Sequence, residues 1–106
     1  MRDKAWIEKM GLDESEYHEL LNLFMETTAS NLERLLKGLG SGDALTVMEA
    51  AHTIKGSSAN LGLENIAAVA KEVEEKARRN SLEGVSEAVQ CIREHCGRIA
   101  ETLKVA

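Results

Sequence analysis

Apolar residues recur every three or four positions along four long stretches of the chain, and a shorter stretch of the same kind precedes them. This spacing is typical of amphipathic α-helices that bury one face and leave the other in water. The short stretch contains Trp6, Ile7 and Met10. The positions expected on the buried faces of the long segments are Tyr17, Leu20, Leu21, Phe24, Thr28, Leu32, Leu35 and Leu39; Val47, Ala51, Ile54, Ser58 and Leu61; Ile66, Val69, Ala70, Val73 and Ala77; and Val85, Val89, Ile92, Cys96, Ile99 and Leu103. The pattern predicts an all-α protein.

Residues that favour helix ends separate these segments. Asp13, followed three residues later by Glu16, resembles a capping box at the start of the first long helix. Ser81 is expected to cap the last helix. The predicted breaks are Gly11, the sequence GLGSGD at 38–43, Gly62, and the sequence RRN at 78–80.

Short connections between long amphipathic helices favour antiparallel neighbours. We therefore expect an antiparallel up-and-down four-helix bundle, with the short additional N-terminal helix as a lid over one end. The chain contains no proline, whereas strand-rich folds need more turn residues. Residues 1–106 are long enough to bury a core without a metal or disulfides, so we interpret them as a single helical-bundle domain.

The composition disfavours nucleic-acid and membrane binding. The formal net charge is −5, whereas binding to a phosphate backbone needs a basic patch. No apolar run approaches the ~20 residues that span a bilayer, and the N-terminus has no signal-like apolar core. Cys91 and Cys96 lie five positions apart on one helix, too far along the axis for a usual disulfide, and are expected to be small buried apolar groups. A cytoplasmic location is expected.

The sequence AHTIKGSSANLG, residues 51–62, places poor helix formers inside a predicted helix. A mid-helix glycine costs about 1 kcal/mol relative to alanine. At about 100° per residue, the apolar stripe of this helix is centred about 140° from His52, so the imidazole is expected on the solvent side. Gly56 and Ala59 follow on the same side. Their small size leaves room for another molecule to approach the ring.

Two charged residues are expected beside His52. Lys55 lies on the same side of the helix, and an antiparallel hairpin turning near Gly62 brings Glu74 opposite His52. A carboxylate there is placed to accept a hydrogen bond from one imidazole nitrogen, which leaves the other with a free lone pair. A nucleophile of this kind, with a cation nearby, suits phosphoryl transfer, which depends on access and charge stabilisation.

Two other kinds of function remain open at this point. Glu49 and His52 form a Glu-x-x-His motif, which supplies ligands to di-metal sites in helical bundles. Such sites need a second motif, and none occurs, so no metal-binding residues are assigned. The other alternative is a non-catalytic helical adaptor, an interaction module in which His52 never acquires acid-labile phosphate.

The same residues resemble the signature of histidine phosphotransfer (HPt) domains, four-helix carriers of two-component phosphorelays. The positions that fit are His52, Lys55, Gly56, Ser57, Ser58, Leu61 and Gly62; Ile54 stands where the family often has leucine. The resemblance implies that His52 accepts a phosphoryl group from a receiver-domain aspartyl phosphate, or from a sensor or hybrid histidine kinase, and passes it to a response-regulator aspartate. Lys55 would offset phosphate charge, Gly56 would admit the partner, and Glu74 would bond the imidazole.

In this interpretation the chain is a phosphoryl carrier with a covalent phosphohistidine intermediate rather than an independent catalyst. No cofactor is expected on the chain itself, and Mg²⁺ is expected on the partner receiver domain. Small or apolar residues near His52 suggest where the receiver docks: Met48, Gly56 and Ala59, with Ala67 on the next helix.

Overall fold

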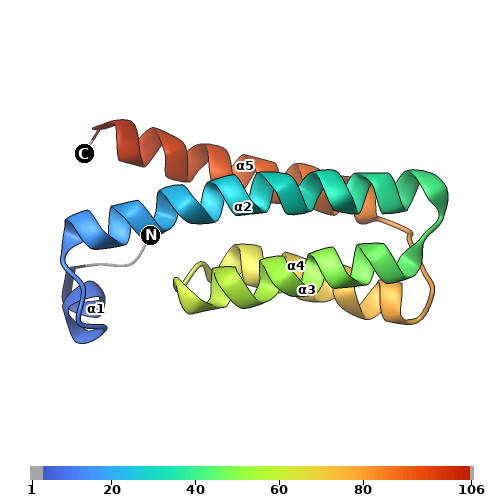
Figure 1. Cartoon of the computed structure of the whole chain (residues 1–106), viewed down its shortest axis with the longest axis horizontal. Helices are drawn as coiled ribbons and strands as arrows, with labels where there is room; N and C mark the ends of the chain where they lie inside the picture. The colour runs from blue at the N-terminus through green and yellow to red at the C-terminus, as the bar shows by residue number, and fades with distance from the viewer. Residues whose placement is uncertain (1–3, 106) are drawn as a thin grey trace.

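The computed structural model describes residues 4–105 of the chain, and these form five helices and no strand. The helices are α1 (Lys4–Lys9), α2 (Glu14–Ser41), α3 (Ala44–Asn60), α4 (Glu64–Arg78) and α5 (Val85–Val105), as labelled in Figure 1. The all-α prediction is confirmed. Within residues 4–105, none of the helices combines the length and apolar character needed to cross a membrane.

The four long helices run alternately up and down and form the predicted antiparallel bundle (Figure 1). The most extensive packing is between α3 and α4, followed by that between α2 and α3. The last helix, α5, completes the bundle by packing against both α4 and α2. The helix predicted to carry His52 is therefore held firmly between two neighbours.

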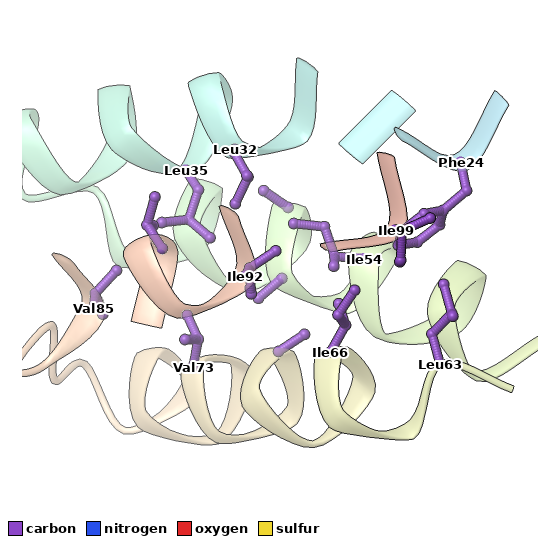
Figure 2. Close-up of a cluster of buried hydrophobic side chains, with 14 of the residues drawn as sticks. Phe24, Leu32, Leu35, Ile54, Leu63, Ile66, Val73, Val85, Ile92 and Ile99 are labelled. Atoms are coloured by element: carbon purple, nitrogen blue, oxygen red, sulfur yellow. The ribbon is translucent and has the colours of Figure 1, made fainter. Parts of the chain in front are cut away.

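Side chains from all four long helices meet in the centre of the bundle. Figure 2 shows Leu35 of α2, Ile54 of α3, Val73 of α4 and Ile92 of α5 converging there, and each is at most 2% exposed. The predicted buried faces are largely confirmed, because apolar side chains are removed from water along the expected stripes. Leu20 is an exception: it is 37% exposed and was wrongly placed on the buried face.

The short helix α1 covers one end of the bundle, as predicted. Its Ile7 is buried, and the Trp6 ring meets the Tyr17 ring edge-on with their centroids 5.8 Å apart. The Tyr17 hydroxyl donates a 2.8 Å hydrogen bond to the backbone oxygen of Leu61. This bond ties the start of α2 to the end of α3.

The helix α2 begins at the predicted capping box and ends inside the predicted break at 38–43. The capping box is present, since the Glu16 amide donates to Asp13 and the Asp13 amide donates to the Glu16 side chain. Within the GLGSGD segment, α2 continues to Ser41, Gly42 ends it in the left-handed conformation, and Asp43 caps α3. Gly38 is buried where α2 crosses α3, and a Cβ there would lie 3.0 Å from Val47 Cγ2. The Asp43 backbone oxygen would lie 3.1 Å from the same Cβ, so the close approach of the start of α3, rather than a left-handed backbone conformation, requires this glycine.

The prediction that Ser81 caps α5 was wrong. The helix α5 begins at Val85, and the connection from α4 runs through Asn80 and Gly84, which have φ values of 61° and 76°. Because Gly84 takes up the left-handed conformation that reverses the chain, the helix starts after it rather than at the serine.

The two cysteines are free thiols on α5, as predicted, but both are half-buried rather than fully buried. Burial raises the pKa of the Cys96 thiol.

Candidate functional site

The candidate site is formed by the antiparallel hairpin of α3 and α4. At the end of α3, the amide of Gly62 donates to Ala59 and that of Leu63 donates to Ser58. These bonds close the helix, and the chain reverses directly into α4. As a result, His52 and Lys55 on α3 face Glu74 on α4.

The Glu74 carboxylate joins the predicted site residues. Its Oε2 atom lies 2.7 Å from Nδ1 of His52, and its Oε1 atom accepts a 2.6 Å hydrogen bond from the Lys55 ammonium. The Glu74 side chain is only 4% exposed, whereas that of His52 is 66% exposed. A buried carboxylate therefore holds one edge of an imidazole whose remaining surface is open to solvent.

The charge state of Glu74 fixes the proton on His52. Burial raises the pKa of the Glu74 carboxyl, but hydrogen bonds from Lys55 and His52 and their positive charges outweigh this effect, and the net pKa is lowered. Glu74 is therefore ionised at neutral pH and can only accept hydrogen bonds. The proton of the His52–Glu74 bond must reside on Nδ1, so Nε2 carries a free lone pair whenever the ring is neutral.

The poor helix formers after His52 have two different explanations. Ser57 and Ser58 donate hydrogen bonds to backbone carbonyls one turn earlier, and Ser58 is buried on the core side of α3. Gly56 is exposed, and an added Cβ would meet no atom within 4 Å. Packing within the chain does not require this glycine. The free-energy cost of a glycine in the middle of α3 is therefore not offset by a contact at this position.

The residues proposed for docking lie near His52 but differ in exposure. Ala59 is exposed on α3, Met48 is half-buried one turn before His52, and Ala67 is half-buried on α4. In the two turns of α3 that follow His52, the exposed residues include Gly56 and Ala59, which have little or no side chain.

The structure does not bring metal ligands together around the Glu-x-x-His motif. Glu49 is exposed, and His52 bonds Glu74. Among residues 4–105, no three His, Cys, Asp or Glu side chains are grouped so that they could hold a metal ion.

The sequence interpretation missed Arg78, which contacts the site. Its Nη2 atom lies 3.3 Å from Glu74 Oε2, one helical turn further along α4. An arginine four residues after a glutamate is a recognisable helix pair, but Arg78 was interpreted only as a signal for the end of the helix.

Comparison with known proteins identifies the family. The family model for the Hpt domain matches residues 19–102. The chain belongs to the Hpt family. This Hpt domain also resembles the crystal structure of histidine-containing phosphotransfer protein B (HptB) from Pseudomonas aeruginosa PAO1, with 32% sequence identity and a TM-score of 0.77. The match covers 86% of this chain and 79% of the HptB chain. A search of curated proteins gave no match.

These matches establish the general function. The chain is a histidine phosphotransfer domain of phosphorelays, and as an Hpt domain it interacts with response regulators and kinases of such relays. Of the alternatives left open by the sequence, family membership favours the carrier over an adaptor without covalent chemistry.

Proposed function

We propose that His52 is the residue that carries the phosphoryl group, on its Nε2 atom. The observation that carries this proposal is the geometry of the ring: Nδ1 is held 2.7 Å from a buried carboxylate, and the side chain is 66% exposed. Among residues 4–105, Nε2 has no hydrogen-bond partner. The nucleophilic atom is therefore oriented and accessible.

The transfer step follows from this arrangement. The Nε2 lone pair attacks the phosphorus of a receiver aspartyl phosphate; the N–P bond forms, the O–P bond breaks, and the aspartate carboxylate leaves with the electron pair. With the proton still on Nδ1, the phosphorylated ring is an imidazolium. The negative charge of Glu74 stabilises this cation, as a buried carboxylate does for the histidine of a catalytic triad. The reverse step delivers the group to a response-regulator aspartate.

In this proposal, the partner proteins supply the metal ion and the phosphoryl donor or acceptor. Mg²⁺ is proposed to act on the receiver domain, where it offsets the charge of the phosphoryl group. In this chain, Lys55 offsets part of the negative charge at the site, and Gly56 leaves room for the receiver. We propose that the receiver docks over Met48, Ala59 and Ala67. A sensor or hybrid histidine kinase is the alternative phosphoryl donor.

The chain's three histidines provide a matched test. The protein is incubated with a phosphorylated receiver domain, and acid-labile phosphate is mapped in the wild type and in His18→Gln, His52→Gln and His95→Gln. We expect label in all proteins except His52→Gln. The His52→Gln variant should remain folded, because the side chain is mostly exposed and a glutamine amide also carries N–H donors for Glu74. Label on His18 or His95, or its persistence in His52→Gln, would contradict the proposal.

A further inference from the structure

The guanidinium of Arg78 lies close to the reactive imidazole. His52 Nδ1 and Arg78 Nη2 both contact the same oxygen, Glu74 Oε2, at 2.7 and 3.3 Å. The two nitrogen atoms can therefore be no further apart than the sum of these distances, 6.0 Å. A cation at this range has a substantial electrostatic effect on any charge that develops on the ring.

Arg78 and Lys55 hold Glu74 differently. Lys55 makes the shorter bond, 2.6 Å, and its side chain is 33% exposed, whereas the Arg78 bond is 3.3 Å and its side chain is 62% exposed. Removing the close cation from a buried carboxylate is costly. Lys55 is therefore expected to stay bonded to Glu74. Arg78 can weaken its bond to Glu74 and bind another anion with a smaller loss of free energy.

The balance of charges at the site also favours Arg78 as the residue that binds a phosphoryl group. Glu74 and Lys55 form a neutral pair, so Arg78 contributes a surplus positive charge. A phosphoryl group on a side chain adds about −1.5 to −2 at neutral pH. A guanidinium presents five N–H donors in a planar fork, which allows it to keep one bond to a carboxylate while binding phosphoryl oxygens with others.

We propose that Arg78 binds the phosphoryl group on His52 directly, bridging it to Glu74. This inference rests on the proposed role of His52. It assigns the main phosphoryl contact on this chain to an α4 arginine, while Lys55 neutralises Glu74.

The experiment uses phosphoramidate, a small phosphoryl donor, because no receiver interface is then involved. Initial rates of His52 phosphorylation are measured for the wild type, Arg78→Gln, Arg78→Lys and Arg79→Gln. Arg79 is the matched control, because it is the adjacent exposed arginine and has no hydrogen bond or ion pair with Glu74. We expect Arg78→Gln to be about tenfold slower, the effect of losing one charge-assisted hydrogen bond. Arg78→Lys should lie between it and the wild type, and Arg79→Gln should match the wild type.

A double-mutant cycle separates direct contact from positioning of Glu74. If Arg78 binds the phosphoryl group, Arg78→Gln should still slow the reaction in a Glu74→Gln background, and it should shift the ³¹P resonance of the phosphohistidine. Loss of the effect in that background, or Arg78→Gln behaving like Arg79→Gln, would overturn the inference. Equal labelling of His52→Gln and the wild type would instead refute the proposed acceptor, so the two failures are distinguishable.

Discussion

Gly38 and Gly56 both lie inside long helices of this protein, and their surroundings are opposite. Around Gly38, where α2 crosses α3, a Cβ would lie 3.0 Å from Val47 Cγ2 and 3.2 Å from Thr46 Cβ. Around Gly56, one turn after His52, it would meet nothing within 4 Å. Each glycine costs its helix about 1 kcal/mol. The first cost is offset by close packing within the chain, while no contact at the position of the missing side chain offsets the second.

The largest expected effect is on the packed glycine. Gly38→Val forces side-chain atoms into the contact with α3 and should destabilise the fold by about 2–3 kcal/mol, as overpacking does. Gly40→Val is the matched control on the same helix, because a Cβ at Gly40 meets no atom within 4 Å. Urea denaturation of both variants measures the difference. Equal stability of the two would show that the α2–α3 crossing does not need its glycine.

The next effect concerns the carboxylate that holds His52. Glu74→Gln removes the charged acceptor of the Lys55 and His52 hydrogen bonds and should destabilise the fold by about 1–2 kcal/mol at pH 7. Because the folded-state pKa of Glu74 is depressed below 4.5, this stabilisation is present above the unfolded pKa and is lost as pH falls through the lower folded value.

The stability difference between wild type and Glu74→Gln should therefore shrink between pH 5 and pH 3. Denaturation at several pH values tests this, with Glu75→Gln, an exposed neighbour, as the control. A difference that grows toward low pH would contradict the assigned sign.

The open glycine should affect transfer rather than folding. Gly56→Leu places a bulky side chain beside the imidazole and should slow phosphoryl acceptance from a receiver at least about tenfold, or 1.4 kcal/mol. Acceptance from phosphoramidate should change little, because the small donor needs no docking surface. Equal slowing with both donors would mean that the leucine blocks the ring itself and not the partner.

The smallest expected effect is a gain in stability. Gly56→Ala should stabilise the protein by about 0.5–1 kcal/mol, because alanine favours a helix and the space beside Gly56 is empty. Thermal or urea denaturation measures the change. A destabilised Gly56→Ala protein would show that the glycine has a structural role after all.

The sequence predicted most of the fold because apolar periodicity is a local signal. It placed His52 on the solvent side and Glu74 opposite it, since both follow from helical angles and hairpin register. It could not separate Gly38 from a helix break, because only the distance between α2 and α3 shows why that glycine is needed. Ser81 was misassigned because a serine between two helices is a common N-cap residue. The true start of α5, after Gly84, depends on how α4 and α5 pack.

The charged partners were the least predictable part of the site. The sequence placed Lys55 beside His52 but did not predict that its ammonium bonds Glu74 at 2.6 Å. Arg78 was missed because a charged residue near the end of a helix usually has a simpler explanation, interaction with the helix dipole. Which carboxylate oxygen a flexible side chain reaches depends on rotamers that the sequence does not show.

The His52 imidazole and the charged side chains of Lys55, Glu74 and Arg78 come from one continuous part of the chain, the hairpin of α3 and α4. The outer helices α2 and α5 supply none of these side chains. Substitutions on the water-facing surfaces of α2 and α5 can therefore accumulate while the chemistry at the ring is inherited unchanged.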